Sequence, residues 1–110
     1  MEFALLIFGE EKSWDRMSEQ ERTERFTANR AFGRALAEAG VSVRYGARLA
    51  RPDVLAGEPR AGDGALELGG LWLIEVATEE EALEWGAKVP AGPGNRVEVR
   101  RCDRPGPSAR

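Results

Sequence analysis

The side chains available for chemistry in this 110-residue chain are carboxylates, arginines and amides, because the chain has no histidine and one cysteine. The absence of imidazole excludes Ser-His-Asp and Cys-His nucleophile systems and every His-ligated metal site. The single Cys102 excludes an internal disulfide and a cysteine cluster for zinc or iron–sulfur. No DxDxDG motif or paired-acid spacing indicates another metal site, so we expect no metal and no cofactor.

Two carboxylates, Asp63 and Glu67, lie close together in the sequence and could share proton transfer if burial separated their pKa values. The alternative is a solvated loop charge and a strand-edge charge, since Asp63-Gly64 is also an ordinary turn signal. Arg48, with Arg44, could hold an anionic ligand through the guanidinium fork or serve as surface charge. These residues are the candidate ligand-binding groups outside the helices.

Glu75 and the tryptophans leave further alternatives open. Glu75 interrupts an apolar run and is either a lone cleft carboxylate or a cross-strand partner of Arg100. Trp14 stands in a charged stretch before a predicted helix, where it would cover a cleft or contact a dimer partner. Trp72 and Trp85 are predicted to be packing residues, because aromatic side chains dominate cores and interfaces.

A fourth candidate, Asn29, lies on the longest predicted helix. Residues Ser18 to Ala39 form this helix, with Ser18 and Glu21 as a capping box and Gly40 just beyond its end. Its sheet-facing stripe contains Phe26, Asn29, Phe32, Gly33, Leu36 and Ala39. The Asn29 amide is either a structural group bonded to backbone or a pocket residue that orients a ligand carbonyl or carboxylate.

The other predicted elements are strands and one more helix. The apolar run Phe3–Phe8, which Gly9 ends, reads as a strand buried on both faces. Further strands are expected over residues 41–45, 66–76 with a bulge at Gly69-Gly70, and 97–100. A second helix runs from a capping box at Thr78 to residue 88, and residues 50–64 and 90–94 are loops. This order is βαββαβ, an α+β ferredoxin-like fold with a four-stranded antiparallel sheet and two helices on one face.

A sheet covered on one face only leaves an apolar surface, which predicts a homodimer joined through that sheet face. We expect one domain over residues 1–102 and a flexible tail over residues 103–110. The formal net charge of −3 argues against nucleic-acid binding, because an acidic surface repels polyphosphate. No apolar run is long enough to span a membrane and no signal-peptide core is present, so we expect a cytoplasmic protein.

Five segments occur in the order typical of the YCII-related family, and more closely of its DGPF-domain branch. They are FALLIFG at 3–9, AFGRALAEAG at 31–40, LGGLWLIEV at 68–76, EEALEW at 80–85 and VEVR at 97–100. The chain resembles this family over residues 1–100. The resemblance implies a dimeric α+β barrel of two ferredoxin-like protomers joined through their sheets, with a small-molecule cleft between helices and sheet.

The chain departs from this family pattern at the positions that would carry chemistry. The Asp-Gly-Pro-Phe segment of the branch is missing, and only Asp63-Gly64 resembles it. The resemblance also implies an acid/base pair of a helix His and an Asp before a Pro, but those positions hold Asn29 and Val89. Neither side chain transfers a proton near neutral pH.

Two functions are therefore predicted as alternatives. The first is a dimeric small-molecule-binding or regulatory module with degraded catalytic positions and a small anionic ligand. The second is a lactonase- or isomerase-type enzyme that uses carboxylate and arginine groups on a small anionic or carbonyl-bearing substrate. The predicted ligand-binding residues in either case are Asn29, Arg48, Asp63 and Glu67.

Overall fold

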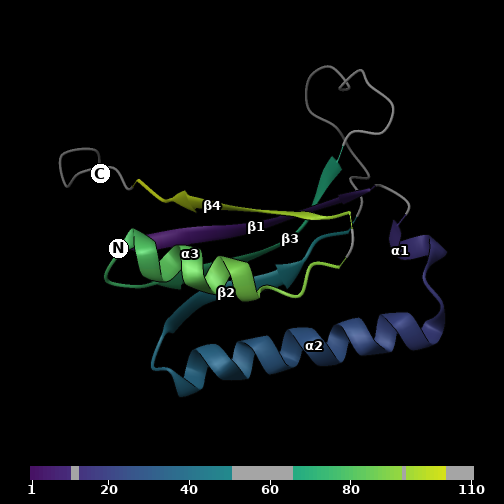
Figure 1. The fold of residues 1–110 in the computed structure, drawn as a ribbon, viewed down its shortest axis with the longest axis horizontal. Helices are drawn as coiled ribbons and strands as arrows, with labels where there is room; N and C mark the ends of the chain where they lie inside the picture. Colours follow the sequence, from purple (N-terminus) through teal and green to yellow (C-terminus); the bar gives the residue numbers. More distant parts are fainter. Residues whose placement is uncertain (11–12, 51–65, 93, 104–110) are drawn as a thin grey trace.

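A computed structural model describes residues 1–10, 13–50, 66–92 and 94–103 (Figure 1). The strands are β1 (Glu2–Glu10), β2 (Ser42–Arg48), β3 (Leu66–Glu75) and β4 (Arg96–Arg101). The helices are α1 (Ser13–Arg16), α2 (Glu19–Glu38) and α3 (Glu79–Lys88). The predicted loop at 50–64, apart from Ala50, and the tail beyond Asp103 lie outside the described residues.

Local capping signals define where the two long helices begin and end. The Ser18 hydroxyl accepts a hydrogen bond from the Glu21 N–H at 3.1 Å, and the Ser18 N–H donates to the Glu21 carboxylate at 3.0 Å. This reciprocal pair is the predicted capping box of α2. Gly40 follows the helix with φ of 77°, a left-handed conformation that glycine adopts without strain. Thr78 caps α3 by accepting from the Glu81 N–H.

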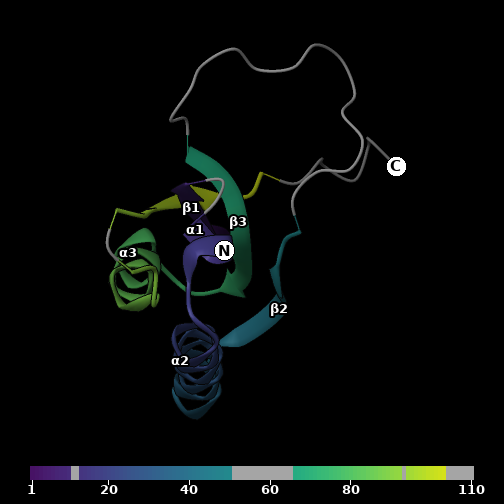
Figure 2. The ribbon, with the colours of Figure 1, turned by 90° about the vertical axis from the view of Figure 1, so that its right-hand side faces the viewer.

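The four strands form one antiparallel sheet in the order β2-β3-β1-β4. Both α2 and α3 lie on the same face of this sheet (Figure 2). This arrangement confirms the predicted ferredoxin-like fold. None of the helices in the described ranges is long and apolar enough to cross a membrane.

The pairing of the two central strands, β1 and β3, confirms the predicted bulge at Gly69-Gly70 and corrects the predicted end of the first strand. Ile7 pairs with Gly70 and Phe8 pairs with Leu68, so Gly69 is the extra residue of a β-bulge. The expectation that Gly9 ends the first strand is wrong, because β1 continues to Glu10. A Cβ atom at Gly9 would lie 2.7 Å from the Asn95 Oδ1, so a larger residue there would displace the Asn95 side chain.

The hydrophobic core fills the space between the sheet, the C-terminal part of α2 and α3. Its members are Phe3, Leu5, Phe32, Leu36, Ile74, Val76, Ala82 and Val89. The Phe32 ring makes edge contacts with Trp72 at 5.2 Å and with Trp85 at 6.0 Å between centroids. These contacts confirm that Trp72 and Trp85 are packing residues. Burying one aliphatic or phenylalanine side chain of this core contributes roughly 1.5–3 kcal/mol to the free energy of folding.

Glu75 lies on the sheet face away from the helices, and its predicted pairing with Arg100 is wrong. The Arg44 guanidinium donates to the Glu75 carboxylate at 2.6 Å and holds its pKa below the ordinary value. The sheet order gives the reason: β2 is the neighbour of β3, whereas β4 lies beyond β1. Glu75 is therefore a surface ion-pair residue and not a cleft carboxylate.

Candidate functional site

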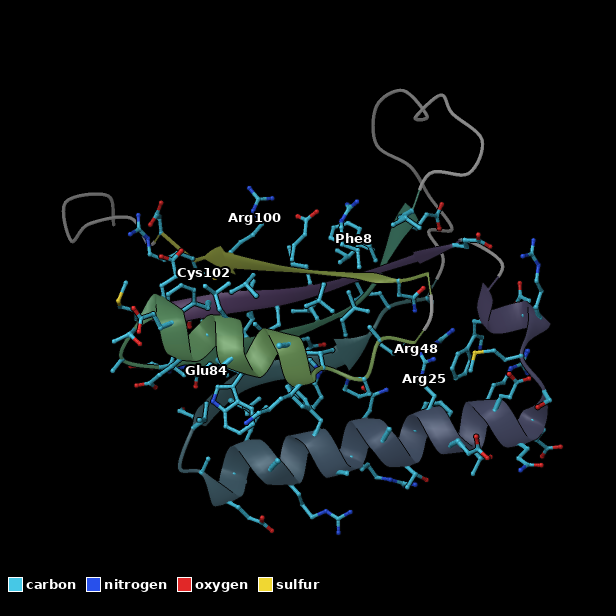
Figure 3. The ribbon with its side chains drawn as sticks, viewed as in Figure 1. Phe8, Arg25, Arg48, Glu84, Arg100 and Cys102 are labelled. Carbon is cyan, nitrogen blue, oxygen red and sulfur yellow. The ribbon has the colours of Figure 1, made fainter. Side chains whose placement is uncertain are left out.

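A cavity of about 840 Å³ separates the N-terminal part of α2 from the sheet. Residues from α1, α2, β1 and the adjoining ends of β2 and β3 line it. Figure 3 shows the side chains of Arg25 and Arg48 between α2 and the sheet. We call this space the α2 cleft. Its volume is in the range of small-molecule sites, roughly 300–1,000 Å³.

The α2 cleft brings together three of the residues predicted to bind a ligand. Asn29, Arg48 and Glu67 line it from α2, β2 and β3 respectively. Asp63 lies outside the described residues. Val89, at the second family position, is buried in the core with 8% of its surface exposed. The family resemblance associates positions 29 and 89 with proton transfer. In this structure Asn29 lines the cleft, whereas Val89 is packed in the core.

Several glycines around the cleft let neighbouring side chains approach the backbone closely. Gly9, Gly33, Gly46, Gly69 and Gly70 all border the cavity. A Cβ atom on Gly46 would lie 2.7 Å from the Trp72 ring, and one on Gly33 would lie 3.2 Å from it. The Trp72 indole therefore lies directly against backbone. The part of the cleft over the sheet is lined by glycine backbone, the Trp72 ring and aliphatic side chains such as Ile7 and Leu68.

One wall of the cleft is built around Trp14, in the short helix α1. The Trp14 ring meets Phe26 edge-on at 5.3 Å, and the Arg48 guanidinium lies 4.1 Å from its centroid. Arg22 fixes this helix to α2 by donating from Nε to the Trp14 carbonyl at 3.1 Å. Trp14 was predicted either to cover a cleft or to contact a dimer partner. The structure places it at the α2 cleft, where its ring contacts Arg48.

Two cleft residues, Arg25 and Asn95, were missed by the sequence reasoning. Arg25 donates from Nη1 to the Ala91 carbonyl at 3.3 Å, and the Asn95 amide donates to the same carbonyl. Arg25 precedes Asn29 by one helical turn, so the helical spacing alone could have found it. Asn95 had no such signal, because it reaches the cleft through the loop that joins α3 to β4.

Three arginines and one amide that line the cleft have no ion-pair partner among the described residues, although Glu10, which also lines it, is paired with Arg16. Within the described ranges, no carboxylate lies within 4 Å of the guanidinium groups of Arg25, Arg30 or Arg48. The half-buried Asn29 amide likewise has no hydrogen-bond partner in this part of the chain. Arg44, the other predicted anion-binding arginine, is instead paired with Glu75 away from the cleft.

This arrangement offers cationic and amide donors beside aromatic surface, which suits a small ligand with an anionic or carbonyl group. Among the described residues, no group of three His, Cys, Asp or Glu side chains converges as metal ligands would.

A search of curated proteins found no match to the chain. A family model described as the YCII-related domain matches residues 1–103, which include every strand and helix of the structure and the lining of the α2 cleft. The match agrees with the resemblance that the segments in β1, α2, β3, α3 and β4 indicated. By this match over nearly its full length, the chain belongs to the YCII-related family.

Proposed function

We propose that this protein binds a small anionic or carbonyl-bearing molecule in the α2 cleft and acts as a binding or regulatory module. The observation that carries the proposal is the set of unpaired polar groups in the cleft. Asn29 and Arg48 border a cavity of about 840 Å³ and have no polar partner in the described part of the chain. Donors that border a cavity of this size and are not engaged by other side chains can bind the anionic or carbonyl group of a ligand.

The residues at the family's acid/base positions favour binding over catalysis. An asparagine amide at position 29 and a valine at position 89 have no proton to exchange near neutral pH. Val89 also packs in the core, so its side chain does not reach the cleft. Binding and orientation of a ligand need neither group.

A lactonase- or isomerase-type activity remains the second candidate because of Glu67. This half-buried carboxylate lines the same cleft as Arg48, so a base and a cation border one cavity. If Glu67 were the base, Glu67→Gln would abolish turnover of a small lactone while leaving ligand affinity nearly unchanged. Binding without turnover by the parent protein supports the first candidate.

The binding proposal is tested by a screen of small carboxylates and amides, read by intrinsic fluorescence. Trp14 and Trp72 border the cleft, so an occupant should change their emission. We expect hits with the parent protein that Asn29→Leu weakens and that Arg34→Gln, on exposed surface of the same helix, leaves unchanged. A screen in which no compound alters fluorescence or melting temperature would contradict the proposal.

We also propose that the protein forms a homodimer through the sheet face opposite α2 and α3. Because strand side chains alternate, the inward positions of Leu5 and Ile74 put Leu6 and Leu73 on the other face. Figure 3 shows Phe8 and Arg100 pointing to this outer side. Tyr45, paired with Leu73 across β2 and β3, is 57% exposed. Covering such a face in a stable dimer buries more than about 1,000 Å² in total.

Sedimentation at micromolar concentration tests the dimer. We expect the parent protein to sediment as a dimer and Leu73→Arg to sediment as a monomer. Leu83→Arg is the matched control, because Leu83 is 53% exposed on α3, away from the sheet face. A monomeric parent protein would refute this proposal.

A further inference from the structure

We propose that the Arg48 guanidinium, stacked on Trp14, is the anion receptor of the α2 cleft, and that the cleft selects flat, conjugated carboxylates. The inference rests on the proposed binding function and specifies its ligand class. It also assigns Trp14 as a positioning residue that acts through Arg48. Its support is the geometry of the two side chains and the composition of the surrounding walls.

Arg48 is positioned so that its hydrogen-bond donors remain available. The guanidinium carbon lies 4.1 Å from the Trp14 ring centroid, a cation–π contact. A guanidinium that stacks on an aromatic ring keeps its N–H donors pointing outward in its own plane. Within the described ranges no carboxylate lies within 4 Å of Arg48. A bidentate carboxylate can therefore bind the edge of this group while the indole holds its face.

The neighbouring arginine of the cleft is less available. Arg25 donates from Nη1 to the Ala91 carbonyl and lies against Gly92 in the loop before β4. This contact ties Arg25 to the loop and leaves Arg48 as the better anion receptor of the two. Figure 3 shows the two side chains entering the same space from α2 and from β2.

The walls around Arg48 favour a flat ligand over a puckered one. Trp14 and Phe26 form an aromatic corner on one side, and the Trp72 ring borders the cavity on the sheet side. Gly46 and Gly33 let the Trp72 indole lie close against backbone, beside the aliphatic side chains of Ile7, Leu49 and Leu68 that also line the cleft. Aromatic faces gain offset-stacked or edge contacts from a flat ring that a saturated ring does not match.

The experiment uses the whole protein and three bicyclic probes in isothermal titration calorimetry. The probes are 2-naphthoate, its fully saturated analogue decahydro-2-naphthoate, and the neutral amide 2-naphthamide. The first comparison removes flatness at constant charge, and the second removes charge at constant shape. We expect 2-naphthoate to bind at least about tenfold more tightly than either analogue, from stacking and from the charge-assisted fork.

Variants separate the roles of Arg48 and Trp14. Arg48→Gln should lower 2-naphthoate affinity by about tenfold or more and leave 2-naphthamide affinity nearly unchanged. The ratio of the two affinities should therefore fall to near one. Arg48→Lys should restore part of that ratio, since it keeps the charge without the planar fork. Trp14→Leu should weaken 2-naphthoate binding and Trp14→Phe should rescue it, because phenylalanine keeps an aromatic face. Arg34→Gln removes the same charge outside the cleft and should change nothing.

The outcomes distinguish this inference from the binding function itself. Equal affinity for 2-naphthoate and the saturated acid would overturn the selection for flat ligands, while binding of either would leave the proposed function standing. Equal affinity for 2-naphthoate and 2-naphthamide, or an unchanged ratio in Arg48→Gln, would overturn Arg48 as anion receptor. If small acids from the screen bind but 2-naphthoate does not, the inference is wrong and the function holds. If no compound binds, both this inference and the proposed binding function are wrong. Thermal melts of each variant confirm that it is folded.

Discussion

The two parts of helix α2 face the same sheet, yet one is packed and the other is open. In the C-terminal part, Phe32 and Leu36 are buried with 6% and 0% of their surface exposed. In the N-terminal part, Phe26 is 49% exposed, and Arg25 and Asn29 border the cleft. Helical regularity is the same throughout, so the difference comes from what lies opposite each part.

Opposite the packed part lie large core residues, and α3 lies beside it (Figure 1). Opposite the open part the sheet presents Gly46 and Gly70, which contribute backbone alone. The comparison teaches that a cleft needs no special element in this fold. On the same helix the packed part presents Phe32 and Leu36 to the sheet, whereas the open part presents Arg25 and Asn29 to the cleft.

The largest expected effect is in the packed part. Phe32→Ala should cost about 3–5 kcal/mol of unfolding free energy, because it empties a core site between Trp72 and Trp85. Phe26→Ala, on the same helix, should cost less than about 1 kcal/mol. Denaturant melts of both variants measure the difference. Similar losses for the two would show that the open part is packed as tightly as the core.

A smaller effect is expected where α3 approaches β4. A Cβ atom on Gly86 would lie 2.5 Å from the Val99 Cγ2, so Gly86→Ala should destabilise by about 1–3 kcal/mol. Gly33→Ala meets Trp72 at 3.2 Å beside the open cleft, where the ring has room to shift, and should be nearly neutral. Chemical denaturation compares the pair, and Gly86→Ala with Val99→Ala should recover part of the loss. A neutral Gly86→Ala would mean that α3 moves freely on the sheet.

Asn29→Leu should change stability little, or increase it slightly, since it removes a half-buried amide that has no partner among the described residues. The same variant should lose ligand binding. A thermal melt beside the fluorescence screen measures both quantities. The structural alternative expects the reverse, a loss of about 1–3 kcal/mol from an unpaired partner group. Clear destabilisation with no ligand for the parent protein would decide for that alternative.

The smallest effect concerns pH and the start of α2. The backbone N–H and the hydroxyl of Ser18 hydrogen-bond with Glu21 and hold its pKa below the ordinary value. A lowered folded-state pKa stabilises the protein above the unfolded-state pKa, and this stabilisation is lost as pH falls through the folded value. Glu21→Gln should therefore flatten the acid limb of the stability profile slightly. Carboxyl NMR titration checks the pKa directly, and a Glu21 value at or above the ordinary one would contradict this account.

Short-range patterns predicted much of the fold. The capping box of α2, the bulge at Gly69 and the buried position of Phe32 depend on residues close in sequence or on periodicity, and all three were confirmed. The partner of Glu75 was predicted wrongly, because a cross-strand pair depends on which strands are neighbours and in what register. Asn95 was missed for a related reason, since it reaches the cleft only through the loop that joins α3 to β4, whereas the helical spacing from Asn29 could have indicated Arg25.

The sequence by itself determined the order of the four strands and two long helices, the family, and the absence of imidazole chemistry, but not the short helix α1. Helix caps and hydrophobic periods are local, and they act before any distant contact forms. The tertiary structure decided which side chains share the α2 cleft. Arg48 meets Trp14, and Glu67 faces the same cavity, because the antiparallel sheet brings the ends of β1, β2 and β3 together beneath the N-terminal part of α2. No local pattern contains that information, since it arises from strand order and from how elements distant in sequence pack against one another.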